Sequence, residues 1–172
     1  EWADGDRVEL QLPMSLSMRT WQVNKNSVSG DYGPLTLSLK IGEKYEQKDS
    51  RAAAIWDSKW QKGADPEKWP TTEIYPTTPW NYALVLGKTD PLKDFKVIRK
   101  EWPADNFPFT IGSVPLEVKA FGRLVPEWKA EESGLCGVLP EEDAVKGAKE
   151  EITLIPMGAA RLRISAFPNS RE

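Results

Sequence analysis

Histidine is missing from this chain of 172 residues, and cysteine occurs once, as Cys136. Histidine is the commonest general base and metal ligand in proteins, so its absence excludes Ser-His-Asp and Cys-His nucleophilic catalysis. A single cysteine excludes an intrachain disulfide and a cysteine-based zinc site. Because Cys136 lies in the apolar stretch 134–139 with no basic neighbour that would favour a thiolate, we expect it to be a small buried hydrophobic residue.

The chain also lacks long apolar runs and a surplus of basic residues. No run approaches the roughly 18 apolar residues of a membrane-spanning helix, and 23 Lys and Arg against 26 Asp and Glu give a net charge of −3. No basic stripe is present to neutralise phosphates, so we expect no nucleic acid and no membrane as partner. The polar first residues contain no signal peptide, and they lead so directly into a predicted strand that we expect the chain to be cut from a longer one.

Short segments of alternating or continuous apolar residues, separated by Gly and Pro, predict an all-β fold. The segment 7–13 places Val8, Leu10 and Leu12 on one face, which we expect to lie against a core, and 16–21 is expected to pair with this segment. Further strands are expected over 35–41, 80–86, 95–99, 115–125 (with a bulge at Gly122), 152–156 and 161–165. About nine strands in all predict a β-sandwich or jelly roll.

We expect a single β-sandwich domain, residues 1–172, with one Trp- and Pro-rich insertion at about 43–79. Within the insertion, 50–63 predicts one short helix, because it is rich in alanine, begins at a polar capping residue and ends at a glycine. The rest of the insertion, 64–79, is expected to be an ordered surface loop. A second polar segment, 127–149, predicts a solvated connection.

Four of the eight tryptophans lie in or beside the insertion. Sugars pack their C–H faces on aromatic rings while their hydroxyls bind flanking polar side chains, so such tryptophans indicate a carbohydrate-binding surface. The candidate carbohydrate-binding residues are Trp56, Trp60, Trp69, Trp80, Asp57 and Asn81. The alternative is that the helix packs Trp56 and Trp60 on the sheet as part of the core, while Trp69 and Trp80 brace a loop against neighbouring prolines.

The carboxylates are numerous, but the sequence indicates no catalytic pair. A glycosidase needs two carboxyl groups about 5–9.5 Å apart, one of them desolvated enough to hold a proton. The acidic clusters at 131–132 and 141–143 are expected to be solvated, and nothing further supports the isolated Glu73 and Glu117. No Asp-x-Asp-x-Asp-Gly calcium loop occurs. We therefore predict no catalytic residue and no metal ligand in this chain.

Four segments carry a pattern that extends over most of the chain. They are Leu-Ile-Pro…Leu-Arg-Ile…Phe-Pro at 154–168, Gly-Asp-Arg-Val-Glu-Leu-Gln-Leu-Pro-Met at 5–14, Asp-Tyr-Gly-Pro-Leu at 31–35 and Trp-Asn-Tyr at 80–82. In order and spacing they resemble the C-terminal β-sandwich region of bacterial β-L-arabinofuranosidase-type glycoside hydrolases. In that family an α/α-barrel with a glutamate and a zinc–cysteine site precedes the β-sandwich. Met157 and 159–160 depart from the pattern, since relatives often have an aromatic residue and a cysteine there.

The resemblance implies a non-catalytic accessory β-sandwich that packs on the catalytic α/α-barrel of the same parent chain and stabilises it. No cofactor is expected in this chain, and the zinc would belong to the barrel. A homodimer is compatible with this role, and the family favours a periplasmic or extracellular location. The alternative function is a carbohydrate-binding module that uses the tryptophans of the segment 56–80. An accessory domain should expose an apolar patch, whereas a binding module should expose rings flanked by hydrogen-bonding side chains.

Overall fold

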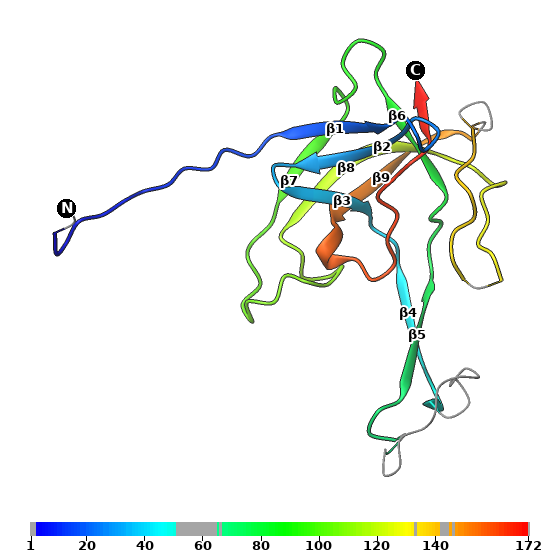
Figure 1. Cartoon of the computed structure of the whole chain (residues 1–172), viewed down its shortest axis with the longest axis horizontal. Coiled ribbons are helices and arrows are strands. Elements are labelled where there is room, and N and C mark those ends of the chain that lie inside the picture. The colour runs from blue at the N-terminus through cyan, green and yellow to red at the C-terminus, as the bar shows by residue number, and fades with distance from the viewer. Residues whose placement is uncertain are drawn as a thin grey trace.

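The computed structural model describes residues 3–50, 65, 67–132, 134–141, 145 and 147–171, and its fold is all-β, as expected (Figure 1). The strands are β1 (Leu16–Trp21), β2 (Ser27–Tyr32), β3 (Leu35–Leu39), β4 (Glu43–Lys48), β5 (Thr71–Pro76), β6 (Tyr82–Leu86), β7 (Lys96–Arg99), β8 (Leu116–Leu124), β9 (Lys149–Pro156) and β10 (Asn169–Arg171), with a short 3-10 turn η2 (Met157–Ala159). The helix expected over 50–63 lies, apart from Ser50, outside the described residues.

Eight of the strands form one sheet, in the order β1-β2-β3-β9-β8-β6-β10, with β7 pairing the first half of β8. All neighbours are antiparallel except β10, which runs parallel to β6. The remaining two strands, β4 and β5, pair only with each other in the described structure and form a ribbon that projects from the body (Figure 1). This β4–β5 ribbon occupies part of the predicted insertion.

The sheet curls so that β1–β3 lie over β8 and β9, and the apolar side chains of both layers share one core (Figure 1). The largest fully buried apolar side chains are Phe167, Leu37, Leu84, Leu154, Ile155, Val118 and Val125. The strand β6 is buried at every position, as its continuously apolar sequence predicts for a central strand. The β-sandwich-like architecture expected from the strand pattern is therefore present.

The segment that follows η2 joins two distant parts of the sheet. Phe167 forms an isolated antiparallel bridge with Val28 of β2, and the next residue, Pro168, accepts a hydrogen bond from Leu84 N of β6 at 2.8 Å. The prediction of a strand over 161–165 is wrong, since this segment forms no strand. Leu39 and Ser38 of β3 form hydrogen bonds with the backbone of Ile164 alone, which does not make a strand pair. Burial nevertheless alternates there, since Arg161 and Arg163 are exposed, Leu162 is half-buried and Ile164 is buried.

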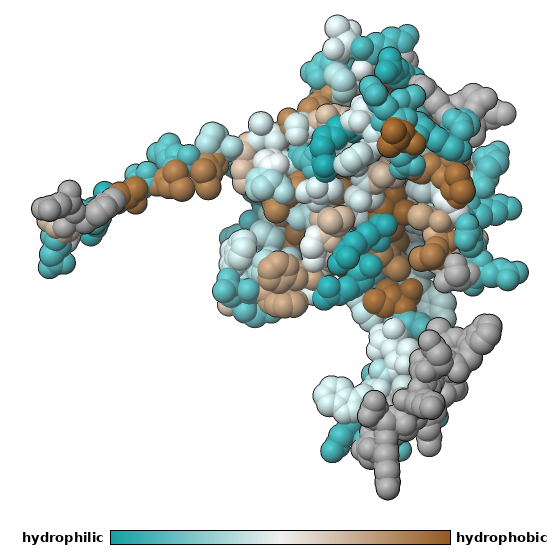
Figure 2. Space-filling model, viewed as in Figure 1, coloured by the Kyte–Doolittle hydropathy of each residue, from teal (hydrophilic) through white to brown (hydrophobic). Residues whose placement is uncertain are grey.

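Residues 7–13 correct a second prediction. They are extended but form no strand, and Val8, Leu10 and Leu12 are 69%, 75% and 74% exposed instead of facing a core. The strand β1 pairs with β2 rather than with 7–13. No strand was expected at the position of β2. We call residues 3–15 the N-terminal arm. In Figure 2 its apolar atoms gather along one side, as the alternation predicts, but within the described structure no sheet covers them.

Three smaller predictions also change. The segment 64–79 contains β5, so part of the expected loop is a strand. Gly122 continues the ladders with β6 and β9 without a bulge, and a Cβ there would lie 3.1 Å from Ile152 and Tyr82 side chains. Cys136 is exposed. It lies in a surface loop, where its backbone forms an isolated antiparallel β-bridge with Ala130. Among the described residues, no helix is long and apolar enough to cross a bilayer.

Candidate functional site

The predicted carbohydrate-binding residues do not form a single surface in the described structure. Trp56, Trp60 and Asp57 lie outside the described residues. Trp69 precedes β5, and its side chain is exposed at 74%. Trp80 lies just before β6 at the body of the domain, where it packs against the core.

Trp80 and Asn81 both hold the loop that follows β8. The ring of Trp80 contacts the buried ring of Trp128 edge-on, with centroids 5.2 Å apart. Asn81 donates from Nδ2 to the carbonyl oxygens of Val125 and Trp128, at 2.8 and 3.1 Å. Both donors of the Asn81 amide nitrogen are thus used inside the protein, so this residue positions the loop. The ring of Trp80 thus packs on Trp128 and the core, and the expected contact of Trp80 with a neighbouring proline stays a prediction.

One face of the β4–β5 ribbon carries a charged cluster around Tyr75. Glu46 and Glu73 lie opposite each other across the two strands, and Lys48 Nζ lies 2.8 Å from Glu46 and 3.9 Å from Glu73. Tyr75 donates its hydroxyl to Glu73, and Lys48 lies 6.0 Å from the centroid of the tyrosine ring. Hydrogen bonds from Lys44 and Lys48 hold the pKa of Glu46 at about 2. Glu46 is therefore a permanent anion and no proton donor at neutral pH.

Glu117 is the most deeply buried carboxylate in the described structure. Its residue is 7% exposed, and its Oε1 lies 2.7 Å from both Lys40 Nζ and Lys100 Nζ. Burial alone would raise the pKa of Glu117, but the hydrogen bonds and charges of the two lysines hold that pKa below its ordinary value. A glycosidase acid needs a raised pKa. Glu117 therefore links β8 to Lys40, which follows β3, and to Lys100, which follows β7, and its lowered pKa does not suit a general acid.

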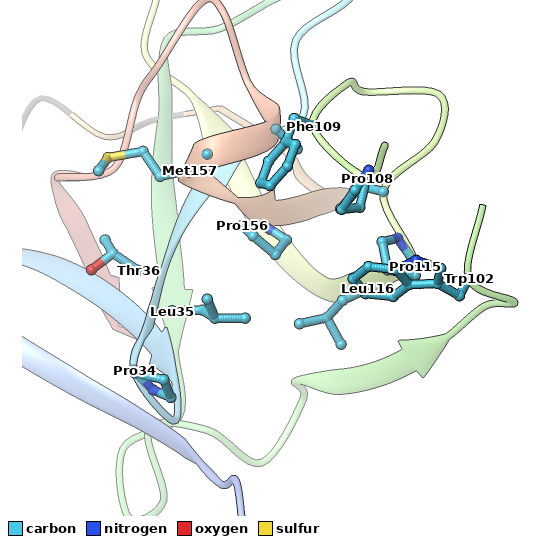
Figure 3. Close-up of a pocket in the computed structure, with 13 residues that line it drawn as sticks. Pro34, Leu35, Thr36, Trp102, Pro108, Phe109, Pro115, Leu116, Pro156 and Met157 are labelled. Atoms are coloured by element: carbon cyan, nitrogen blue, oxygen red, sulfur yellow. The ribbon is translucent and has the colours of Figure 1, made fainter. Parts of the chain in front are cut away.

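An apolar groove of about 400 Å³ lies where β3 and β8 begin and β9 ends (Figure 3). Leu35 of β3 and Leu116 of β8 point toward each other across it, and Pro156 lies between them. Met157 of η2 and Phe109 form its upper wall in the view of Figure 3. No charged side chain is among the described residues that line this apolar groove.

Trp102 forms the side wall of the apolar groove, on the loop that follows β7. Its indole ring is 61% exposed, and Nε1 donates to Asn106 Oδ1 at 2.6 Å. Farther along the loop, the rings of Phe107 and Phe109 contact each other edge-on with centroids 5.4 Å apart. The polar atom of Trp102 is thus satisfied within the loop, so its ring presents mainly apolar surface.

The C-terminal end of the N-terminal arm, at Ser15, lies beside the apolar groove. Ser15 O accepts a hydrogen bond from Gly33 N at 2.9 Å, and Pro34 of the same turn lines the groove. Gly33 has a φ of +55°, which suits glycine, and a Cβ there would lie 2.9 Å from the Met14 side chain. Met14 also packs against the core. The root of the arm is therefore fixed next to the groove, while Leu10 and Leu12 extend away from the body.

The far end of the arm forms a closed turn. Asp6 N donates to Ala3 O at 3.1 Å, and Ala3 N donates to Asp6 Oδ2 at 2.8 Å. Gly5, between them, has a φ of +94°. The arm and the groove are thus two exposed apolar surfaces, and exposed apolar surface is typical of an interaction site. Sequence reasoning missed Trp102 and the groove, because its walls come from segments far apart in the chain.

A comparison of the chain with protein-family models, with curated proteins and with solved structures found no match. Within the described part of the chain, no group of three or more acidic or cysteine side chains is placed to hold a metal ion. The candidate site thus consists of three surfaces of the described structure: the apolar groove, the N-terminal arm and the β4–β5 ribbon.

Proposed function

We propose that this chain is a non-catalytic accessory β-sandwich domain of a carbohydrate-active enzyme. In this role it docks on the catalytic α/α-barrel of its parent protein and stabilises that barrel. The parent would be a glycoside hydrolase of the β-L-arabinofuranosidase type that acts on L-arabinofuranosyl-containing glycans. Zinc and the catalytic glutamate would belong to the barrel.

The observation that carries this proposal is the exposed apolar surface of the arm and the groove. Val8, Leu10 and Leu12 are more than two-thirds exposed, and Trp102 extends the apolar surface on the groove side. Side chains of this size are rarely gathered on the free surface of a monomeric protein unless they mark an interaction site. The resemblance of 5–14 and 154–168 to the accessory region of the enzyme family supports the choice of partner.

The test is to produce the polypeptide encoded immediately upstream of Glu1 and this chain as two separate proteins and to measure their association calorimetrically. We expect a 1:1 complex. Replacing Leu10 and Leu12 by Ser should weaken it by roughly tenfold or more per leucine, since burying a leucine is worth about 1.5–3 kcal/mol. The control is Glu9→Ser with Gln11→Ser, on the opposite face of the arm.

Three results would overturn the proposal. The first is an upstream sequence without helical repeats that contain a glutamate and several cysteines. The second is a control variant that weakens the complex as much as the leucine variant. The third is hydrolysis of an arabinoside by this chain alone, because a non-catalytic domain has no such activity.

The carbohydrate-binding alternative is favoured by one observation on the ribbon. Trp69 is exposed, and the carboxylate of Glu73 and the ammonium group of Lys48 lie beside the Tyr75 ring. A sugar needs such a ring for its C–H face and such polar groups for its hydroxyls. Affinity electrophoresis against arabinan, pectin and xylan tests it. Saturable binding that is lost on Trp69→Ala or Tyr75→Ala, and on Trp56→Ala or Trp60→Ala, would support the binding module. Trp80→Ala is a poor probe, because that ring packs on the core.

A further inference from the structure

The strand β1 is an open edge of the sheet. It stands first in the sheet order, and in the described structure only β2 pairs with it. The other side of this layer is closed, because Val28 of β2 bridges to Phe167. Asn169 Nδ2 also donates to Asn26 O on that side, at 2.8 Å. An open edge presents unpaired N–H and C=O groups to another strand that lies beside it.

The N-terminal arm runs on from β1 without turning back on it (Figure 1). The root of the arm is fixed in this direction, because Ser15 O accepts a hydrogen bond from Gly33 N and Met14 packs against the core. The arm therefore does not cover the edge of its own β1. Within the described structure the backbone of residues 7–13 forms no hydrogen bond. Residues 7–21 thus combine an uncovered edge with an extended, unpaired arm.

The hydrogen bond at Ser15 shows which backbone groups point to the open edge. Along an extended strand the N–H and C=O of one residue point to one side, and those of the next residue point to the other. Ser15 O points to Gly33, which follows β2, so the odd-numbered residues of β1 point their backbone groups toward β2. The even-numbered residues present theirs at the open edge. In the arm, the even-numbered residues from Val8 to Leu12 are the apolar ones.

We propose that two copies of this chain pair antiparallel through residues 7–21, so that the arm of each copy adds a strand to the β1 edge of the other. Strand addition at an open sheet edge is a recurring mode of recognition between chains. In the proposed register Met14 lies opposite Met14 of the second copy, and the other pairs follow by counting outwards. One two-fold axis relates both arms, so the contact closes as a dimer.

This register joins two apolar faces. Leu16 and Met18 pack against the core from β1 and are half-buried, so part of each side chain stays uncovered at the edge. Directly opposite residues of an antiparallel pair have their side chains on the same face. The exposed leucines of the arm therefore cover these side chains in the second copy. The opposing pairs are Leu12 with Leu16, Leu10 with Met18 and Val8 with Thr20.

The charges on the other face distinguish this register from its neighbours. Glu9 lies opposite Arg19, which binds Asp31 through Nε and Nη2 at 2.6 and 2.9 Å and keeps Nη1 for a second carboxylate. A slip by two residues one way would set Arg7 opposite Arg19, and a slip the other way would set the uncharged Gln11 there. Opposite charges stabilise a cross-strand pair, and like charges destabilise it. The proposed register is therefore the favoured one.

Pro13 is compatible with the pairing. Proline has no N–H, so it fits a ladder only where no donor is required. Pro13 is odd-numbered like Ser15, and its backbone groups therefore point away from the second copy. The proline interrupts no hydrogen bond between the two chains.

The pairing goes beyond the proposed function. It needs no barrel, and it uses none of the described residues that line the apolar groove. A dimer therefore leaves both grooves open to a barrel, whereas a barrel that binds the arm competes with the second copy. The tests below use this chain alone. Their failure would leave the docking proposal standing, and a failure of the barrel complex would leave the pairing standing.

Sedimentation equilibrium of the whole chain measures the pairing. We expect a mass of 19.4 kDa at about 1 µM and twice that mass at about 500 µM, because a contact of two strands lies at the low end of interface sizes. Glu9→Lys should weaken the dimer about tenfold, since it sets two cations opposite each other at two places in the dimer. Glu67→Lys makes the same charge change on an exposed residue outside the pairing and should leave the dimer unchanged. A monomer at about 500 µM, or equal weakening by both variants, would overturn the proposal.

Cross-linking tests the register. Gln11→Cys with Ser17→Cys, in a chain that also carries Cys136→Ser, places each new thiol opposite its partner in the second copy, with Cα atoms about 4.5 Å apart, a separation that a disulfide spans. Within one chain the two positions lie about 20 Å apart along the extended segment, so only a disulfide between copies forms. Mild oxidation should give a covalent dimer on a non-reducing gel. Arg7→Cys with Ser17→Cys, out of register, should stay monomeric. Equal cross-linking of the two double variants, or none in the first, would contradict the pairing.

Discussion

The backbones of Val28 and Phe167 exchange two hydrogen bonds, 2.8 Å from Val28 N to Phe167 O and 2.9 Å from Phe167 N to Val28 O. Because Pro168 also accepts from Leu84 N, this short segment connects β2 with β6. The Phe167 ring is completely buried and is the largest side chain with no exposed surface in the described structure. One residue thus combines the two contributions, backbone pairing and core packing, that hold the curled sheet together.

Phe167→Ala should therefore be among the most destabilising single substitutions. Removing a fully buried phenylalanine costs about 3–5 kcal/mol, through lost burial and the cavity left behind. The free energy of unfolding from urea titration followed by tryptophan fluorescence measures the loss. Phe109→Ala, at the exposed wall of the apolar groove, should cost less than about 1 kcal/mol. Equal losses for the two variants would contradict the assigned core.

The Glu117 carboxylate makes the stability depend on acid pH. The pKa of Glu117 is lowered in the folded protein from its ordinary value of 4.5, so the folded state favours the ionised form. Its contribution is fully present above pH 4.5 and is lost as pH falls through the lowered folded pKa. Urea titrations at a series of pH values between neutrality and acid should show this loss.

The variant Glu117→Gln isolates the Glu117 contribution. It leaves Lys40 and Lys100 without their shared carboxylate, so the unfolding free energy at neutral pH should fall by about 1–3 kcal/mol. Its stability should also decrease less steeply below pH 4.5 than that of the unmodified chain. A parallel pH dependence in the two proteins would show that Glu117 has the same pKa folded and unfolded.

Leu10 and Leu84 are the same residue type in opposite environments, and the pair tests the position of the N-terminal arm. Leu10 is 75% exposed, whereas Leu84 is fully buried in β6. Leu10→Ala should change the unfolding free energy by less than about 0.5 kcal/mol, and Leu84→Ala should lower it by about 2–5 kcal/mol. If Leu10→Ala were as costly as Leu84→Ala, the arm would have to fold against the core of the isolated chain.

Cys136 should react with a thiol reagent in the native protein. Its side chain is exposed in the loop that contains the Ala130 bridge, contrary to the buried position expected from its apolar neighbours. Labelling with a chromogenic disulfide should reach one equivalent without denaturant, and Cys136→Ser should change the unfolding free energy by less than about 0.5 kcal/mol. Reaction only after unfolding would place the thiol in the interior.

The fold could be predicted where side-chain patterning alone decides the structure. The strand expected over 80–86 is β6, and its apolar run is buried at every position. The strand β2 was missed because Ser and Asp interrupt its sequence. It is buried nevertheless, since Arg19 pairs with Asp31 at 2.6 Å and Ser29 Oγ donates to Ser165 O. Arg19 lies on the neighbouring strand β1, and Ser165 lies 136 positions away, so the pattern within β2 alone could not reveal either partner.

Alternation also identifies a face without identifying what covers that face. In residues 7–13 the alternation is regular, yet Val8, Leu10 and Leu12 are exposed in the described structure. The apolar groove was missed for a related reason. Its walls come from β3, β8, β9 and the loop with Trp102, and only the sheet order brings these segments together. The site therefore depends on long-range pairing that composition and spacing do not encode.

The contact between Asn169 and Asn26 also constrains how the chain can be synthesised. These residues are 143 positions apart, so β2 emerges from the ribosome long before the segment that completes its surroundings. Contacts of such separation form late, because a long loop must close before they contribute. Until then the apolar side of β1–β3 stays uncovered in the nascent chain, which exposes it to aggregation. Translation speed and chaperone access should consequently influence the yield of folded protein.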